Sequence, residues 1–578
     1  MKKNPSRRNL LEPLLLALFI LCYVGLYRRY SFARLQELAP LLPDVISARD
    51  LFIWPGAASR LAAAFLSRLF VEPFAGGLFL AALLLGARAL LLALRRPLFP
   101  FLACVPPLLL FLAIARLDHS IFAPAGENHL VAPSLGFCLA LLIALVARRS
   151  RRLLVPLFVI LGYPLLGFYA LFGALLSGGR PREILYAVAW VILFPLLYTL
   201  LYSHASLLDA YTAALLLPDN YGASPWNWWS LAGALLAAAL LIYTGAPRRP
   251  KTAPSRVAGA TALLVLLLST FFLSNRDPSF HALLAAQYHA ARDRWEAVLE
   301  HTSAVRSPDR LAILYRNLAL LKLQRLGEDM FAFPHEGDDM PRYPAAVYIA
   351  GSDLFFHHGH LNHAYRWAME RLVQHGVTVD ALRVMTRAAL LNGEFPLARK
   401  HAGALRRVPF HAAEADAYKR FTTHPASLAK ASFLPRGMSP RNNRLGEKTA
   451  LLEPFLLEYY RDAPPDTRET LDLSLAAALT LKDTARFRAL FPLYRQNHLT
   501  PPRHAREAAL LFARLQQQDE ESIPGVDAAT RRRFERFIPA LVDAQGQPEN
   551  RRSLAPLAKP FGDTYWYYYF AVKNLKTN

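Results

Sequence analysis

The sequence predicts an all-α protein in which a polytopic transmembrane helix bundle is followed by a tetratricopeptide-like α-solenoid domain. Apolar runs long enough to cross a bilayer recur up to Asn275, and no such run follows in the sequence. From Ser279 onward the pattern changes to short amphipathic helices in pairs, with turns at Gly, Asp and Pro. Equivalent turn positions recur at a spacing near 34 residues, which predicts helical repeats.

Length and composition narrow the class of protein. The chain has 578 residues, which is more than one ordinary domain, and a formal net charge of +23. Many basic residues stand in clusters between apolar runs, where Lys and Arg set the orientation of a membrane protein. No RNA-binding or zinc-finger signature accompanies them, so we expect the lipid bilayer as a partner and no nucleic acid. The 3 cysteines all lie in apolar runs, which excludes a disulfide framework.

Residues 1–275 are expected to form a transmembrane domain of about eight helices plus an interfacial or re-entrant segment, because a crossing needs about 20 mostly apolar residues. Charged residues inside the apolar runs are few. Glu12 and Arg88 lie near enough to the ends of their runs for the side chains to snorkel. The predicted crossings are Leu10–Tyr27, Phe74–Leu94, Leu98–Ala115, Leu130–Ala147, Leu153–Leu176, Ile184–Tyr202, Trp229–Thr244 and Val257–Leu273.

Four basic clusters between these crossings are expected on the cytoplasmic side, by the positive-inside rule. The clusters are Lys2/Lys3/Arg7/Arg8, Arg95/Arg96, Arg148/Arg149/Arg151/Arg152 and Arg248/Arg249/Lys251/Arg256. Two predicted crossings separate the first cluster from the second, and two separate the second from the third. Three predicted crossings separate the third cluster from the fourth, which is the wrong parity.

The segment Ser206–Pro218 is expected to supply the missing element, either as a tilted crossing or as a re-entrant helix. If it crosses, Val257–Asn275 runs outward and the C-terminal domain lies outside the cytoplasm. If it does not cross, the C-terminal domain is cytoplasmic. We favour the first arrangement, in a bacterial inner (cytoplasmic) membrane with a cytoplasmic N-terminus and a periplasmic C-terminal domain.

Residues 276–410 are predicted to form tetratricopeptide-like repeats of two helices, in which Gly supplies a left-handed turn and Ala lets the helices approach closely. Residues 411–578 are predicted to continue the solenoid irregularly. Their aromatic tail, FGDTYWYYYF, is expected to cap the solenoid or to pack on the membrane surface. The equivalent turn positions are Gly359/Ala364, Gly393/Ala398, Gly327, and Arg292/Ala297.

Two groups of polar residues are candidates for chemistry. His360 and His363 lie one turn apart in a cluster with His357 and His358, so they could share a metal, although solvated histidines in a turn are the simpler interpretation. In an external loop, Asp118, His119 and Glu127 could supply a general base or a divalent-ion site; the alternative is a polar turn. No phosphate-binding Gly-rich loop or other cofactor motif is present in the sequence, so no cofactor is expected.

The chain resembles an uncharacterised family of bacterial polytopic membrane proteins with a tetratricopeptide-like C-terminal domain. Three stretches carry the resemblance: PGAASRLAAAFLSRLFVEPFAGGLFLAALLL, HHGHLNHAYRWAMERL and GDTYWYYYF. The resemblance implies the domain layout given above. It implies no particular activity.

A more distant likeness connects the chain to membrane glycosyltransferases that use polyprenyl-phosphate sugars. They too have many crossings, a long first external loop with interfacial helices and a soluble C-terminal domain. In that family an acidic residue of the first loop acts as a base or metal ligand, which points to Asp44 and Asp50 here. Arg60 and Arg68, on a predicted interfacial helix of the same loop, would then hold the lipid phosphate.

Two functions therefore follow from the sequence. The first is an envelope scaffold or binding protein whose repeat surface engages a protein or peptide partner. The alternative is a glycosyltransferase-like enzyme of envelope polysaccharide or glycan assembly, with a lipid-linked sugar as substrate and Asp44, Asp50 or Asp118 as the catalytic residue.

Overall fold

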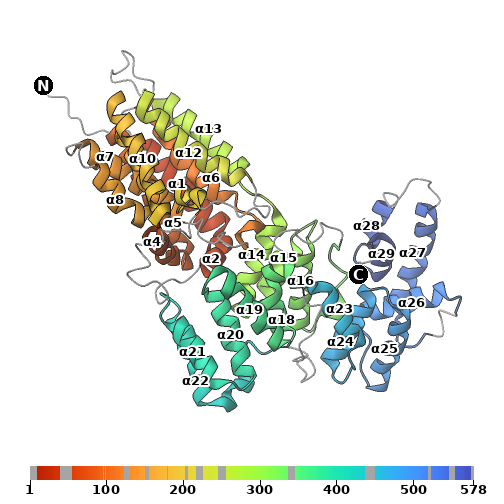
Figure 1. The fold of residues 1–578 in the computed structure, drawn as a ribbon. Coiled ribbons are helices and arrows are strands. Elements are labelled where there is room, and N and C mark those ends of the chain that lie inside the picture. The colour runs from red at the N-terminus through yellow and green to blue at the C-terminus, as the bar shows by residue number, and fades with distance from the viewer. Residues whose placement is uncertain are drawn as a thin grey trace. The chain divides into compact units, whose positions relative to one another are not determined.

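A computed structural model describes residues 10–39, 55–95, 97, 99–122, 131–149, 155–178, 180–201, 206–215, 225–244, 256–335, 345–435, 450–518, 523–545 and 554–573. The fold class that the sequence predicts is confirmed as all-α, since these residues form helices and no strand (Figure 1). They divide into two compact units. Unit 1 comprises residues 1–276, 371–382 and 403–416, and unit 2 comprises the rest.

Unit 1 is built mainly from apolar helices. Within it α5 packs on α1 and α7, α7 packs on α9, and α12 packs on α6. Its elements are α1 (Leu11–Cys22), η1 (Tyr23–Tyr27), α2 (Arg29–Leu38), α4 (Ala57–Ser67), η2 (Arg68–Val71), α5 (Pro73–Leu94), η3 (Pro100–Cys104), α6 (Val105–Ala115), η4 (His119–Phe122), α7 (Ala132–Arg149), α8 (Val155–Leu166), α9 (Phe168–Ser177), α10 (Pro181–Leu201), α11 (Leu207–Thr212), α12 (Pro225–Thr244) and α13 (Arg256–Leu273).

Three helices among the described residues, α5, α7 and α10, are long and apolar enough to cross a membrane. The number rises to five if two helix pairs with a break count as one span each. One pair joins Leu11–Tyr27 to α2 at a bend of 81°, and the other joins α13 to the helix that follows it. The predicted crossings Leu98–Ala115 and Trp229–Thr244 coincide with shorter apolar helices.

The single helix predicted over Leu153–Leu176 is wrong, because the chain breaks at Gly167. Gly167 has φ +58° and ψ −133°, a backbone conformation that favours glycine. A Cβ at Gly162 would lie 3.2 Å from the Cβ of Ala170, although residues eight apart in a straight helix are separated by about 12 Å. Helices α8 and α9 therefore fold back against each other.

Residues 206–215 pack into this bend. The amide of Phe168 donates to the carbonyl oxygen of Ala213 at 2.7 Å, and the hydroxyl of Tyr163 donates to that of Ala210 at 2.6 Å. A Cβ at Gly167 would lie 2.3 Å from the Ala213 oxygen, so no larger residue fits. Helix α11 in this segment has 6 residues and is too short to span a bilayer.

The end of the last apolar run is held by Asn275. Its backbone amide donates to the Ala115 carbonyl at 2.8 Å, and its side-chain amide donates to the Leu117 carbonyl at 2.8 Å. The guanidinium of Arg28 donates to the Asn275 carbonyl at 3.3 Å. Asn275 therefore links the end of α13 to the end of α6, and an apolar residue could not make the side-chain contact with Leu117.

Unit 2 consists of shorter helices that pack mainly on their neighbours in sequence. Helices α19 to α22 contribute residues to both units. The elements of the C-terminal half are α14 (Pro278–Ala290), α15 (Trp295–Ser303), α16 (Arg310–Lys322), α17 (Leu326–Asp329), η7 (Val347–Gly351), α18 (Ser352–His357), α19 (Leu361–His375), α20 (Val379–Leu391), α21 (Phe395–Arg406), α22 (Ala412–Thr423), η8 (Pro425–Lys430), α23 (Leu452–Asp462), α24 (Arg468–Thr480), α25 (Thr484–Gln496), α26 (Arg503–Leu515), α27 (Ala528–Gln545), α28 (Ala555–Phe561) and α29 (Tyr565–Ala571).

One turn geometry recurs between these helices. A residue with positive φ follows the first helix, and the next amide donates to a carbonyl five residues back, as in a Schellman motif. The positive-φ residues of the first four turns are Asp293, Gln324, Gly359 and Gly393, at spacings of 31, 35 and 34 residues. The spacing of 35 returns between Lys482 and Gln517. The turn positions assigned to Gly327 and Arg292 are wrong. Gln324 makes the first of these turns, since Gly327 lies in α17, and Asp293 makes the second.

Candidate functional site

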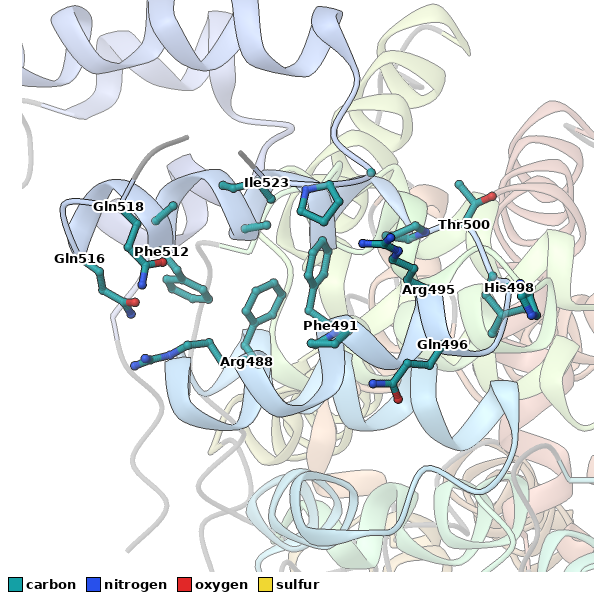
Figure 2. Close-up of a pocket in the computed structure, with 18 residues that line it drawn as sticks. Arg488, Phe491, Arg495, Gln496, His498, Thr500, Phe512, Gln516, Gln518 and Ile523 are labelled. Carbon is teal, nitrogen blue, oxygen red and sulfur yellow. The ribbon is translucent and has the colours of Figure 1, made fainter. Parts of the chain in front are cut away.

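A groove with a volume of about 1140 Å³ lies along α25 and α26 in unit 2, and the turn at residues 523–525 closes one side of it. Figure 2 shows Phe491 near the middle of α25 with Arg488 and Arg495 on either side of it. The described lining residues include no acid. The lining residues are Phe487, Arg488, Phe491, Pro492, Arg495, Gln496, His498, Leu499, Thr500, Pro501, Ala509, Phe512, Ala513, Gln516, Gln518, Ile523, Pro524 and Gly525.

The floor of the groove is aromatic. The ring of Phe487 lies 5.0 Å from that of Phe512 in an edge-to-face arrangement, and 5.3 Å from that of Phe491, centroid to centroid. Phe487 and Phe512 are each 3% exposed, whereas Phe491 is only half-buried. Phe491 is therefore the ring of this cluster that a bound molecule could cover.

Local sequence defines both ends of α25. The Asp483 carboxylate caps the N-terminus by accepting from the Arg486 amide at 2.9 Å. At the C-terminus His498 takes φ +55°, and the Leu499 amide donates to the Tyr494 carbonyl at 2.7 Å, which completes a Schellman motif. These caps fix where α25 begins and ends, and Phe491 lies on the side of this helix that lines the groove.

The rim of the groove is basic. Arg488 and Arg495 are exposed, and neither guanidinium makes a hydrogen bond or ion pair with the described residues. Because they stand seven residues apart on one helix, they share a face at a separation of about 10 Å along the axis. The four residues that join Gln518 to Ile523, DEES in the sequence, lie outside the described residues.

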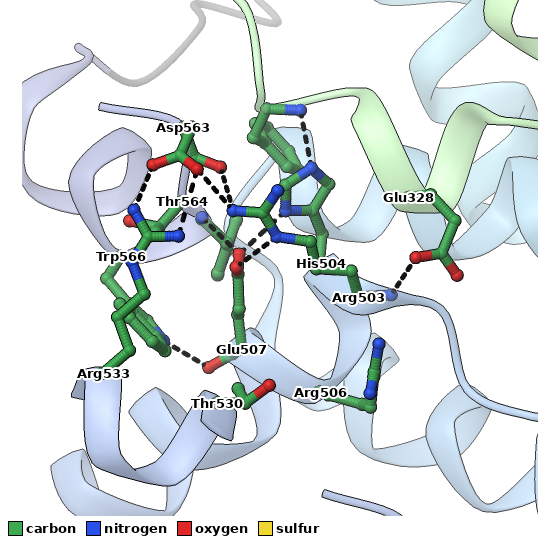
Figure 3. Close-up of polar contacts among 12 residues, drawn as sticks. Glu328, Arg503, His504, Arg506, Glu507, Thr530, Arg533, Asp563, Thr564 and Trp566 are labelled. Carbon is green, nitrogen blue, oxygen red and sulfur yellow. Dashed lines mark hydrogen bonds and ion pairs between the residues drawn. The ribbon is translucent and has the colours of Figure 1, made fainter. Parts of the chain in front are cut away.

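A buried polar network positions α26 (Figure 3). Nδ1 of His504 lies 2.8 Å from a carboxylate oxygen of Glu507, and Nε2 accepts from the Phe331 amide at 3.1 Å. Nε2 is thus the unprotonated nitrogen, and Nδ1–H donates to Glu507. Because both ring nitrogens are engaged within the protein, the pair has a structural role and is not a general base.

The same network fixes the aromatic tail. The Glu507 carboxylate accepts from the Arg503 guanidinium at 2.9 Å and from the Tyr565 amide at 2.8 Å, while the Glu507 carbonyl accepts from the Trp566 indole at 2.7 Å. Asp563 accepts from Arg503 at 2.7 Å and also from Arg533 (Figure 3). The side chains of Tyr565 and Trp566 are 0% exposed, so α29 is part of the core of unit 2.

These contacts lower the pKa of both acids. Burial by itself would raise the pKa of Glu507, but the neighbouring His504, Arg503 and Tyr565 amide outweigh it and lower the pKa. Burial also opposes ionisation of Asp563, yet hydrogen bonds from Arg533 and Arg503 lower the pKa of Asp563 to about 2. Both carboxylates are therefore ionised at neutral pH.

The interpretation of the histidine cluster as a solvated turn is wrong. The exposed fractions of His357, His360 and His363 are 0%, 1% and 0%. The rings pack against aromatic neighbours: His357 lies 4.8 Å from Trp295, and His360 lies 4.5 Å from Tyr459, centroid to centroid. The apolar faces of the imidazole rings favour these positions in the core.

Burial also affects the charge of the cluster. It lowers the pKa of His357 and lowers the pKa of His358 to about 3, so both rings are neutral at physiological pH. The rings of His360 and His363 lie 6.0 Å apart. Within the part of the chain that the structure describes, no group of three or more His, Cys, Asp or Glu side chains is placed to hold a metal ion.

Arg68, which the sequence predicts to hold a lipid phosphate, instead donates hydrogen bonds at the C-terminal end of α2. Its guanidinium donates to the Ala39 carbonyl at 2.7 Å, to the Gln36 side-chain oxygen at 3.3 Å, and to the Gln36 carbonyl. These carbonyls belong to the last turn of α2, where helix carbonyls lack partners within the helix. Arg68 is 2% exposed.

A second buried group of charges lies in unit 1 beside Arg68, and the sequence did not single it out. Arg34 pairs with Glu37 at 3.0 Å and with Asp380 at 2.7 Å, and Arg371 pairs with Asp380 at 2.7 Å. All four side chains are almost fully buried. Asp380 pairs with two arginines from helices far apart in the sequence, and Glu37 supplies the second negative charge of the group.

The other residues predicted for a site are not brought together among the described residues. Arg60 is half-buried on α4 and makes no hydrogen bond or ion pair with them. Asp118 and His119 are half-buried at the start of η4, and each already interacts with another residue. Asp44, Asp50 and Glu127 lie outside the described residues.

Sequence reasoning treated α25 only as one amphipathic helix among several, and so it missed the groove. A signal was present, however. Arg488, Phe491 and Arg495 follow the i, i+3, i+7 spacing of one helix face. What the spacing could not supply is the position of Phe512, which depends on how α26 packs on α25.

The fold and the groove define the class as an all-helical protein with membrane-length apolar helices and an aromatic, basic groove. The chain belongs to a family of unknown function, designated DUF6057, whose model matches residues 5–571. The uncharacterised family suggested by the sequence is confirmed to that extent. No curated protein and no solved structure matches the chain.

Proposed function

We propose that this is a multi-pass inner-membrane protein whose C-terminal helical-repeat domain binds a segment of a partner protein. The groove along α25 and α26 carries this proposal. Its volume of about 1140 Å³ slightly exceeds the usual range for small-molecule sites, and its open aromatic floor suits apolar side chains. The recurring turns at spacings of 31 to 35 residues support a tetratricopeptide-like solenoid, a fold that presents extended binding surfaces.

The bend at Gly167 supports a membrane topology with the C-terminal domain in the periplasm. Helices α8 and α9 have 12 and 10 residues, and folded back they are each too short to cross about 30 Å of hydrocarbon. The third and fourth basic clusters are then separated by two crossings, α10 and α12. All four clusters can therefore face the cytoplasm without a crossing at Ser206–Pro218, and α13 runs outward.

A reporter fused after Asn275 tests this topology. A reporter that is active only in the periplasm should give a signal there, and also when it is inserted after Gly222. Fusions in the basic segment 248–256 should give a cytoplasmic signal. A cytoplasmic signal after Asn275 would overturn the periplasmic assignment.

Peptide selection tests the binding function. The full-length protein in lipid nanodiscs is used to select binders from a displayed library of random peptides, and a selected peptide is labelled for fluorescence anisotropy. We expect Phe491→Ser to weaken binding about tenfold, because a half-buried aromatic ring at the centre of an interface contributes about 1.4 kcal/mol or more.

The matched control is Leu515→Ser. Leu515 is an exposed apolar residue of α26 that does not line the groove, so this variant should bind as the wild type does. Failure to select any peptide, or equal affinity of a selected peptide for the wild type and Phe491→Ser, would contradict the proposal.

A second candidate is the enzyme that transfers a sugar from a polyprenyl phosphate. One observation favours it: Arg60 is half-buried and pairs with none of the residues that the structure describes, so it could hold a lipid phosphate. Arg68 is less suitable because the carbonyls of α2 occupy its guanidinium. This candidate requires that substitution of Asp50 or Asp118 reduces envelope polysaccharide or glycosylation.

A further inference from the structure

The rim of the groove restricts which segment can bind. Arg488 and Arg495 are exposed on one face of α25, and no described residue neutralises either charge. The only other charged or titratable lining residue among those described is His498. A bound segment therefore meets positive charge at both ends of an apolar floor, which favours acidic side chains at matching positions.

The spacing of the two arginines adds a geometric requirement. Seven residues of α-helix rise about 10 Å, and residues i and i+7 lie on the same face. Phe491 stands between the two arginines at i+3 (Figure 2), and Pro492 follows it at i+4. A helix with acids at i and i+7 and large apolar residues at i+3 and i+4 would place each side chain opposite its complement.

We propose that the groove binds an acidic amphipathic helix of a partner protein. One carboxylate of that helix pairs with Arg488, a second pairs with Arg495, and its apolar side chains pack on Phe491. This inference rests on the proposed binding function and specifies the chemistry of the partner. The recognition mode is that of a helix laid into an apolar groove. The charges give specificity for the acidic face, while the aromatic floor supplies the apolar contact area.

Three capped Ala-rich peptides test the inference on the full-length protein in zwitterionic nanodiscs. The first has Glu at i and i+7 with Leu at i+3 and i+4, the second has Gln in place of Glu, and the third has Lys in place of Glu. We expect the Glu peptide to bind about tenfold more tightly than the Gln peptide at low salt. The advantage should shrink as ionic strength rises, because the pairs are exposed.

Charge reversal on the protein tests the assignment to these two arginines. Arg488→Glu and Arg495→Glu should each weaken binding of the Glu peptide about fivefold, whereas the double variant should prefer the Lys peptide. Recovery with the Lys peptide shows that the double variant is folded. Arg532→Glu, at an exposed arginine of α27 outside the groove, is the matched control and should leave the affinity unchanged.

Two outcomes would overturn the inference while leaving the binding function intact. In the first, the selected peptides depend on Phe491, but the Glu and Gln peptides bind equally. In the second, nanodiscs that contain anionic phosphatidylglycerol abolish binding of the Glu peptide to the wild type. The same nanodiscs leave binding of the Lys peptide to the Arg488→Glu/Arg495→Glu variant intact. This pattern would identify the groove as a site for lipid headgroups. If no peptide of any kind binds, the proposed function itself fails.

Discussion

Replacing Glu507 with Ala is expected to release the C-terminal tail, residues 554–573, from the rest of unit 2. The variant leaves the Tyr565 amide and the Arg503 guanidinium without their buried acceptor, and it removes the acceptor of His504 Nδ1–H. Removing one partner of a buried, hydrogen-bonded charge pair typically costs about 3–5 kcal/mol. We expect hydrogen exchange of amides in residues 554–573, measured by mass spectrometry, to accelerate by about a hundredfold or more.

Glu535→Ala is the control for this experiment, because Glu535 is exposed on α27 and takes part in no described ion pair. It should change exchange rates little. Unchanged exchange in Glu507→Ala would show that the aromatic contacts of Tyr565 and Trp566 hold the tail without the polar network.

The lowered pKa values add a pH dependence to the same contacts. For an acid whose folded pKa lies below its unfolded value of about 4, the stabilisation is complete above that value and is lost as the pH falls through the folded pKa. For Asp563 the folded pKa is about 2, and the pKa of Glu507 is also lowered. Protection of the tail in the wild type should therefore fall between about pH 4 and pH 2, and it should fall less in Glu507→Ala.

Replacing Arg88 with Met is expected to destabilise unit 1 by about 3 kcal/mol or more. The guanidinium of Arg88 pairs with the Glu12 carboxylate at 2.8 Å, and Glu12 is only 2% exposed, so the expectation that these side chains snorkel to the surface is wrong. Arg88 also donates to the sulfur of Cys104 at 3.2 Å. Without Arg88 a carboxylate is left unpaired among apolar helices. The measurement is thermal unfolding in detergent micelles, followed by intrinsic fluorescence.

A double-mutant cycle separates loss of the pair from loss of packing. Glu12→Gln/Arg88→Met should regain most of the stability that Arg88→Met loses, because a neutral pair buries no unmatched charge. Arg182→Met, at an exposed arginine on α10, should have little effect. If the double variant is as unstable as the single one, packing of the Arg88 side chain is responsible, and the ion pair is not.

Local patterns were sufficient for the helical class. The period of apolar residues and the length of apolar runs act within one helix, and they were enough to predict helices. The turn at Gly359 and the turn at Gly393 were also found, since glycine at a helix end adopts positive φ without strain. Gln324 was missed because a positive φ at a residue with a side chain has no clear signal in the sequence.

Other features depend on which distant segments meet. Glu12 and Arg88 are 76 residues apart, and only the packing of α1 on α5 brings them together. The break at Gly167 depends on the distant Ala213, whose carbonyl oxygen occupies the space that a side chain at position 167 would need. The histidines of the cluster at residues 357–363 could be placed in the core only once their aromatic neighbours from α15 and α23 were known.

By itself, then, the sequence determined that this protein is helical and where its apolar runs end. The tertiary structure alone decided which charges are paired, where the chain folds back within an apolar run, and that α25 and α26 enclose a basic aromatic groove. The physical reason is that periodicity reports the environment of one helix face. Charge pairing and groove formation also depend on a second helix. The residues of the first helix do not indicate which helix that is.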